Sequence, residues 1–184
     1  LFGVGRSGIV WRSTTGDLAL WQVGAAGVTG TNVIGQVDMT WRVFDSAGDY
    51  NGDGKSDLLW RGEGGSVALW LMNGAASIGG GTVSPGVSPD WMLVSARGDY
   101  DGDGKSDLLW RSAGLGGEVA IWFMDGQTIR SQAVVGAIDK TWTLVDGNGD
   151  YDGDGRSDLL WRGANGAVAI WRTNGAPVAA RQAV

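Results

Sequence analysis

A nine-residue acidic stretch occurs three times in this chain and constrains its fold more than any other feature. The copies read DYNGDGKSD at residues 49–57, DYDGDGKSD at 99–107 and DYDGDGRSD at 150–158. Each copy follows a Gly and precedes Leu-Leu-Trp-Arg. Side chains with a carboxylate or amide oxygen stand at positions 1, 3, 5 and 9 of the stretch, and Gly stands at positions 4 and 6.

This spacing predicts a calcium loop. A hard cation takes about six to eight oxygen ligands, and a coiled loop can point alternate side chains at one centre. Position 7 can offer its backbone carbonyl, and Gly at position 6 permits a turn with positive φ. Position 12, where an EF-hand has Glu, is Trp here, and the flanking Leu-Leu-Trp-Arg is typical of a strand. A turn that binds nothing is the alternative. Three copies with an oxygen-bearing side chain at every ligand position favour a bound cation, because carboxylates packed together repel one another unless a cation neutralises them.

The Trp residues reveal the repeat that surrounds these loops. Trp-Arg pairs occur at 11–12, 60–61, 110–111 and 161–162, about 50 residues apart. Within one unit, short strands are predicted at 91–95, 107–111, 118–124 and 128–135, separated by turn signals such as Asp125-Gly126. Four short strands in a unit of this length predict a blade of a β-propeller.

The predicted fold is therefore all-β: one β-propeller domain over residues 1–184 with about four four-stranded blades. The repeat units are expected at about 1–38, 39–89, 90–139 and 140–184. The first blade lacks its first strand, and its loop has Phe2, Val4 and Gly8 at ligand positions, so no calcium is expected there. Fifteen strands result. A four-bladed ring, a fragment of a larger propeller and an oligomer of partial propellers all remain open, because an exposed strand edge invites pairing.

The amino-acid composition excludes several classes of functional site. The chain has no Cys and no His, which excludes disulfides, zinc or haem sites built on these residues, and Ser-His or Cys-His catalytic pairs. The net charge is −6, and eleven of the 20 acidic residues lie in the three loops, so about three Ca²⁺ ions would balance it. There is no basic stripe for nucleic acid and no apolar run long enough for a membrane span. Calcium loops favour a secreted or cell-surface protein, where millimolar calcium fills weak sites.

The loop, the following Leu-Leu-Trp-Arg and the later Val-Ala-Leu/Ile-Trp resemble the FG-GAP/VCBS-type repeat over nearly the whole chain. The resemblance implies a calcium-binding β-propeller similar to the integrin α-subunit head and to Psathyrella-type lectins. It also implies three ligand sets, in which the residue at position 7 uses its backbone: Asp49, Asn51, Asp53, Lys55 and Asp57; Asp99, Asp101, Asp103, Lys105 and Asp107; and Asp150, Asp152, Asp154, Arg156 and Asp158.

The sequence leaves three functions open. A non-catalytic recognition module for glycan or a cell-surface protein is favoured, because aromatic side chains stack on sugars and are enriched at interfaces. An assembly module that forms a homo-oligomer through its incomplete blade is the alternative. An enzyme is not expected, since Glu63 and Glu118 are the only Glu residues, both lie in Gly-rich turns, and most Asp belong to the loops.

Two repeated residue types have a structural and a functional interpretation. A Trp at fixed register in every blade is expected to form inter-blade core rather than a sugar platform; the strand-two set is Trp60, Trp110 and Trp161. The Arg beside each of them could bind an anion, but pairing with a neighbouring carboxylate is preferred; this set is Arg61, Arg111 and Arg162.

Overall fold

The computed structural model describes residues 7–114, 116–175 and 180–183. These residues form fifteen strands in four antiparallel sheets and no helix. Alternating strand patterns, frequent Gly and the turn signals between strands account for this all-β architecture. Among the residues described, therefore, none forms a helix long and apolar enough to cross a membrane. The chain divides into two compact units, residues 1–87 and 88–184, and each unit contains two sheets.

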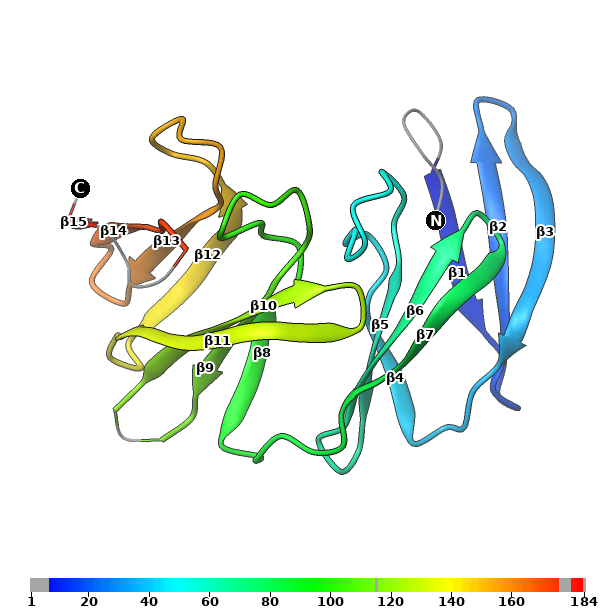
Figure 1. Ribbon diagram of the computed structural model, residues 1–184, viewed down its shortest axis with the longest axis horizontal. Helices are drawn as coiled ribbons and strands as arrows, with labels where there is room; N and C mark the ends of the chain where they lie inside the picture. The colour runs from blue at the N-terminus through cyan, green and yellow to red at the C-terminus, as the bar shows by residue number, and fades with distance from the viewer. Residues whose placement is uncertain (1–6, 115, 176–179, 184) are drawn as a thin grey trace. The chain divides into compact units, whose positions relative to one another are not determined.

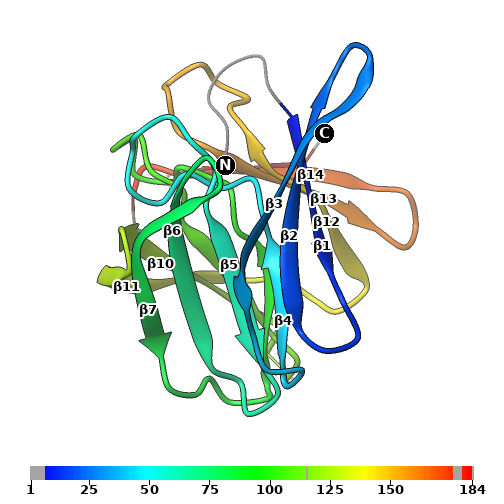
Figure 2. The same cartoon turned by 90° about the vertical axis from the view of Figure 1, so that its right-hand side faces the viewer.

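The first unit contains a three-stranded and a four-stranded sheet, each a meander in chain order (Figure 1). The first sheet consists of β1 (Ser7–Arg12), β2 (Asp17–Gly24) and β3 (Gly27–Gln36). The second consists of β4 (Trp41–Asp45), β5 (Leu58–Gly62), β6 (Val67–Asn73) and β7 (Ala76–Ser84). Figure 2 shows these two sheets side by side.

The second unit contains two four-stranded meanders. The third sheet consists of β8 (Trp91–Ser95), β9 (Leu108–Ser112), β10 (Glu118–Asp125) and β11 (Thr128–Ala137). The fourth consists of β12 (Trp142–Gly149), β13 (Asp158–Gly163), β14 (Val168–Arg172) and β15 (Ala180–Ala183). The predicted strand count is confirmed for the described residues, including the missing first strand of the first sheet, and each sheet has the meander order of a propeller blade.

The register explains the Val-Ala-x-Trp pattern that the second, third and fourth sheets carry. Trp60 on β5 lies opposite Ala68 on β6, and Trp161 on β13 lies opposite Ala169 on β14. The small Ala leaves room for the indole, which reaches diagonally to the Trp of the neighbouring strand. The two ring centroids are 5.2 Å apart for Trp60 and Trp70, a distance typical of a favourable tilted aromatic pair.

Trp60 and Trp161 pack between the two sheets of their units, as predicted for the strand-two Trp residues. In the first unit, Trp60 packs with Leu18 and Leu20 of β2. In the second unit, Trp161 packs with Leu109 and Ile121 of the third sheet. The side chains of Trp60, Trp110 and Trp161 are at most 1% exposed, so none of them can offer a ring face to a sugar. Within each unit, the Trp-bearing face of the second sheet in chain order therefore covers the aliphatic face of the first.

The Arg that follows each of these Trp residues does not behave uniformly, and the predicted carboxylate pairing is wrong for Arg111. Its guanidinium donates to the backbone carbonyls of Ile138, Asp139 and Trp142, which form the link into the next sheet. Arg12 binds the equivalent carbonyls of its own unit, at Val37, Asp38 and Trp41. The guanidinium binds carbonyls rather than a carboxylate because the link turns without pairing to a strand, so its backbone oxygens need hydrogen-bond donors. Arg162 is exposed.

Candidate metal centre

Each acidic loop leaves one strand, coils once and enters the next strand of the same sheet. The strand before the loop is irregular at the same place each time: the pairing register shifts between Val43 and Asp45, between Leu93 and Ser95, and between Leu144 and Asp146. Such a bulge bends a strand and re-aims the residues after it. The repeat therefore encodes the entry angle of the loop as well as its ligands.

Glycine at positions 4 and 6 gives the loop its coil. Gly102 and Gly104 of the second loop have φ values of 78° and 83°, and the glycines of the other two loops share this left-handed conformation. An added Cβ at Gly104 would meet no atom within 4 Å. The requirement for Gly is therefore conformational rather than steric crowding. The prediction of positive φ at position 6 is confirmed, and position 4 shares it.

The position-1 carboxylate organises the coil from inside. Asp99 accepts hydrogen bonds from the backbone N–H groups of Gly102, Asp103 and Gly104, at 2.7, 3.1 and 2.8 Å. Asp49 and Asp150 make the same three contacts in their loops. Backbone donors favour the ionised carboxylate, and they lower the pKa of Asp150, the Gly155 N–H most strongly.

The position-9 carboxylate ties the loop to the sheet. Asp107 is fully buried and accepts from the N–H of Tyr100 at 2.9 Å and from the N–H of Met124, at the end of β10, at 2.8 Å. Asp57 and Asp158 have equivalent partners. Burial raises the pKa of Asp107 to about 7; the two hydrogen bonds oppose this rise, and the nearby Asp99 and Asp103 carboxylates add to it. A cation beside Asp107 would favour its ionised form.

The loops gather acidic oxygens as a metal site requires. Carboxylate oxygens of Asp99, Asp101 and Asp107 lie within 4.8 Å of one another, and so do those of Asp150, Asp152 and Asp158. These are positions 1, 3 and 9 of the second and third loops. The first loop has the amide Asn51 at position 3. The oxygen donor set and the left-handed glycines suit a hard cation such as Ca²⁺.

Position 5 is not part of these acidic groups. Its Oδ1 accepts the N–H of position 7, and its Oδ2 faces a cationic side chain: Asp53 faces Lys55 at 3.4 Å, and Asp154 faces Arg156 at 3.0 Å. In the second loop, Lys105 lies 3.5 Å from Asp103. Ligation by position 5 and by the position-7 carbonyls stays a prediction.

The second and third loops are joined to each other. Ser157 of the third loop donates its N–H to the carbonyl of Asp99 at 2.7 Å and accepts the N–H of Asp99 on its Oγ at 3.0 Å. Tyr100 is fully buried and donates its hydroxyl to the carbonyl of Gly147 on β12. The loops therefore form part of the contact between neighbouring sheets, so their conformation and the packing of the unit depend on each other.

The positions expected to disable the first blade's loop fall largely outside the described residues. Phe2 and Val4 are not described, and Gly8 lies on β1. Two contacts escaped the sequence reasoning altogether: Arg130 on β11 meets the second loop, and Arg172 on β14 lies 3.7 Å from Asp152 of the third loop. Neither Arg recurs at its position in the repeat, so no periodic signal marks it.

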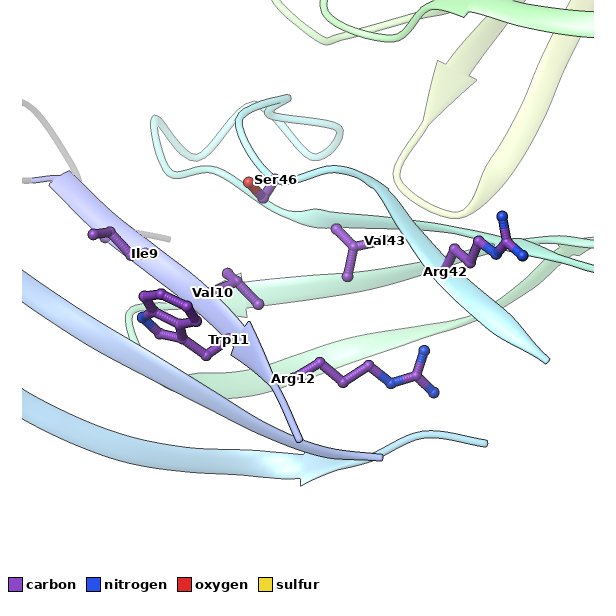
Figure 3. A pocket seen from close by; sticks show the side chains of 8 residues that line it. Ile9, Val10, Trp11, Arg12, Arg42, Val43 and Ser46 are labelled. Atoms are coloured by element: carbon purple, nitrogen blue, oxygen red, sulfur yellow. The ribbon is translucent and has the colours of Figure 1, made fainter. Parts of the chain in front are cut away.

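A cavity of about 520 Å³ lies in the first unit between β1 and β4. Five consecutive residues of β1, 8–12, line it together with Arg42, Val43 and Ser46 (Figure 3). Within the described residues, β1 is the edge of its sheet, because that sheet has no strand equivalent to β4. The cavity therefore follows the edge where a first strand would stand.

Comparison with known proteins supports the interpretation of the repeat. The model of the FG-GAP-like repeat matches residues 49–110, about one third of the chain, from the first acidic loop through the second to Trp110. No curated protein sequence matches the chain. Residues 49–110 therefore carry an FG-GAP-like repeat, and the third loop at 150–158 repeats its acidic pattern outside the matched segment.

Proposed function

We propose that this chain is a calcium-stabilised, non-catalytic recognition module that acts outside the cell and binds carbohydrate or a cell-surface protein. The observation that carries the calcium part is the grouping of positions 1, 3 and 9, with Asp107 and Asp158 buried where the loop meets its sheet. The backbone N–H groups account for the burial of position 9, but they do not offset the repulsion between this carboxylate and the two acidic side chains beside it, which a bound cation would offset.

Positions 1, 3, 5 and 9, with the position-7 carbonyl, would hold the ion. Bound Ca²⁺ supplies the positive charge that offsets the repulsion among these carboxylates. Because position 9 also holds the end of the third strand of the sheet through Met72, Met124 or Thr173, the loop and the end of this inner strand are stabilised together. An ion that binds the folded loop more tightly than the unfolded chain adds its binding free energy to folding.

Thermal unfolding tests this calcium role. The midpoint is expected to fall when millimolar CaCl2 is replaced by EDTA, and to stay low when MgCl2 replaces CaCl2, because Mg²⁺ demands a tighter octahedral site. Isothermal titration with CaCl2 is expected to give about three ions per chain. Identical melting curves in CaCl2 and EDTA would contradict the proposal.

The strand-two Trp residues of the repeat do not supply a site for carbohydrate or protein, because they are buried. Apolar side chains that do reach solvent include Phe44 on β4 and Met92 on β8, exposed by 41% and 51%. A glycan array in millimolar CaCl2, repeated in EDTA, tests this part. Binding that disappears on chelation supports a calcium-dependent lectin, and a blank array with folded, calcium-loaded protein favours a protein partner.

We also propose that the sheets close into a propeller ring. Trp11 lies opposite Ala19 and pairs with Trp21, as Trp60 and Trp70 do in the next sheet. Yet Trp11 is 48% exposed, whereas Trp60 is covered by the sheet before it. An aliphatic sheet face would cover Trp11 in the same way.

The alternative function is an assembly module, and the edge of β1 favours it. An unpaired edge beside a cavity can accept a strand from another chain. Light scattering separates the two cases: a mass of 19.2 kDa favours a ring within one chain, and an integer multiple favours assembly through the incomplete sheet.

A further inference from the structure

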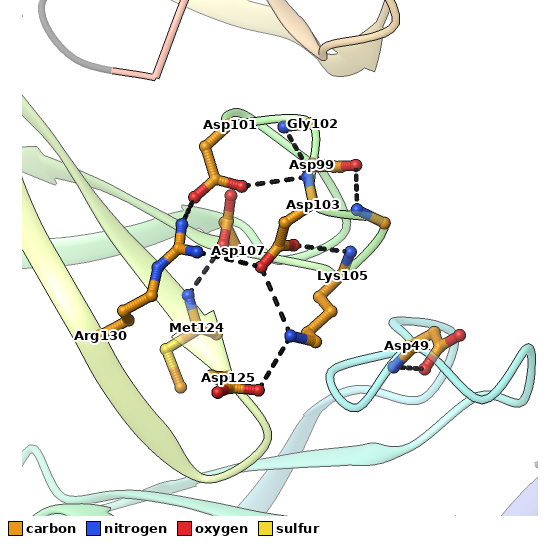
Figure 4. A network of polar contacts seen from close by, with 12 residues as sticks. Asp49, Asp99, Asp101, Gly102, Asp103, Lys105, Asp107, Met124, Asp125 and Arg130 are labelled. Carbon is orange, nitrogen blue, oxygen red and sulfur yellow. Dashed lines mark hydrogen bonds and ion pairs between the residues drawn. The ribbon is translucent and has the colours of Figure 1, made fainter.

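Arg130 reaches the second loop from β11, outside the acidic repeat. Its Nη2 pairs with Oδ2 of Asp101, and its Nη1 lies 3.5 Å from Oδ2 of Asp103. Figure 4 shows the guanidinium between these two carboxylates. Its own side chain is 49% exposed, whereas those of Asp101 and Asp103 are exposed by only 12% and 19%. One guanidinium on the solvent side therefore contacts two mostly buried carboxylates.

Arg130 contacts the outer oxygen of each carboxylate. Oδ1 of Asp101 accepts the N–H of Asp103 at 3.2 Å, and Oδ1 of Asp103 accepts the N–H of Lys105 at 3.0 Å. The Oδ2 atoms lie against side-chain cations instead: Arg130 contacts both, and Lys105 also lies 3.5 Å from Oδ2 of Asp103. A metal that draws on Asp101 and Asp103 therefore meets the guanidinium of Arg130 on both side chains.

The matching position of the first loop has no such cation. In the third sheet Met124 pairs with Ile129, and in the second sheet Met72 pairs with Ser77. The residue after each partner is Arg130 in one sheet and Ile78 in the other, so Ile78 stands where Arg130 does. Ile78 is 55% exposed, which leaves room for a longer side chain.

We propose that Arg130 is a resident counter-ion of the second loop that competes with Ca²⁺ and is displaced when the ion binds. This inference rests on the proposed calcium role. Without calcium, Arg130 offsets part of the repulsion among the four loop carboxylates and stabilises the metal-free sheet. With calcium, the guanidinium must leave the two Oδ2 atoms, so the second loop binds the ion more weakly than its charge alone would give. Arg130 therefore sets the calcium affinity of this loop.

The test measures calcium binding at the second loop alone. Asp53→Ala and Asp154→Ala remove position 5 of the other two loops, and isothermal titration with CaCl2 then compares Arg130 with Arg130→Ala in this background. The variant is expected to bind calcium about two- to thirtyfold more tightly, the range that two partly exposed ion pairs supply. Arg162→Ala removes the same charge from an exposed position on β13 and is expected to leave the affinity unchanged.

Thermal unfolding of the full chain gives a second readout that does not depend on the background substitutions. Arg130→Ala is expected to lower the midpoint in EDTA and to enlarge the rise in midpoint on adding CaCl2. As the converse test, Ile78→Arg is expected to weaken calcium binding at the first loop when Asp103→Ala and Asp154→Ala disable the others.

The outcomes separate the two proposals. Equal or weaker calcium binding by Arg130→Ala, in a chain that does bind calcium, overturns the competition and leaves the proposed function intact; weaker binding would mean that Arg130 orients the carboxylates instead. No calcium binding by any of these proteins overturns both. Tighter binding by Arg130→Ala and by Arg162→Ala alike would assign the effect to net charge and overturn the role of Arg130.

Discussion

Replacement of Asp107 by Ala separates the structural role of the position-9 carboxylate from its role toward a metal. Asp107 is fully buried, and its two oxygens accept the N–H groups of Tyr100 and Met124. Ala leaves both donors buried without an acceptor, at a cost of about 1–3 kcal/mol each. The expected loss of unfolding free energy in EDTA is therefore about 2–6 kcal/mol.

Asp107→Asn refines this expectation, because the amide keeps one carbonyl oxygen and turns its NH2 group toward the other donor. A loss of about 1–3 kcal/mol is expected, between wild type and Ala. Asp103→Ala is the control: Asp103 is a position-5 acid of the same loop whose backbone contact is to the N–H of Lys105, which is partly accessible to solvent. We expect it to cost about 1 kcal/mol or less in EDTA.

Urea unfolding monitored by Trp fluorescence measures these differences, once in EDTA and once in millimolar CaCl2. In CaCl2, both Asp107→Ala and Asp103→Ala are expected to lose the part of the calcium-dependent stability that the second loop supplies and to keep the part from the other two loops. Equal midpoints and slopes for wild type and Asp107→Ala in EDTA would refute the reasoning, because the two buried N–H groups would then have no dependence on this carboxylate. If Asp107→Ala fails to fold, the comparison of Asp107→Asn with Asp103→Ala still tests the order.

Five further substitutions, two of them controls, probe packing, a side-chain contact and loop conformation, each by urea unfolding. Trp161→Ala is expected to lower the free energy of unfolding by about 3–5 kcal/mol, because Trp161 is buried between sheets. Trp11→Ala is expected to lower it clearly less, since Trp11 is 48% exposed. Equal losses would mean that another sheet covers Trp11 in solution. Arg111→Ala is expected to cost about 2–3 kcal/mol through its contacts to the link after β11, and a neutral result would contradict that role. Gly104→Ala is expected to cost about 1–2 kcal/mol through its positive φ, and Gly64→Ala, which meets no atom within 4 Å, far less.

Much of the local structure could be predicted from the repeat. The strand prediction for 91–95 matches β8, and the other strands of that unit differ by one or two residues at their ends. Left-handed glycine in the loops followed from the spacing of Gly between Asp residues. These features are local: hydrophobic alternation, turn chemistry and ligand spacing act within a few residues, so the chain states them directly.

The contacts of the repeated Arg residues were not predictable in this way. Charge alone favours a carboxylate partner, whereas Arg111 binds the carbonyls of a link about thirty residues away. The exposure of Tyr151, 40% against zero for Tyr50 and Tyr100, likewise differs between residues with the same local sequence. Arg111 and Tyr100 both meet the fourth sheet or the link that leads into it, which their own local sequence does not specify.

The sequence by itself determined the all-β repeat, the number and order of the strands, and the loops with the spacing of calcium ligands. Only the tertiary structure decided that Asp107 and its equivalents are buried and bind two backbone donors, and that Arg130 enters the second loop. The physical reason is range. Spacing within a loop fixes which oxygens can converge, but burial and the pairing of Arg130 with Asp101 join residues that are distant in the chain and meet only when strands have paired and sheets have packed.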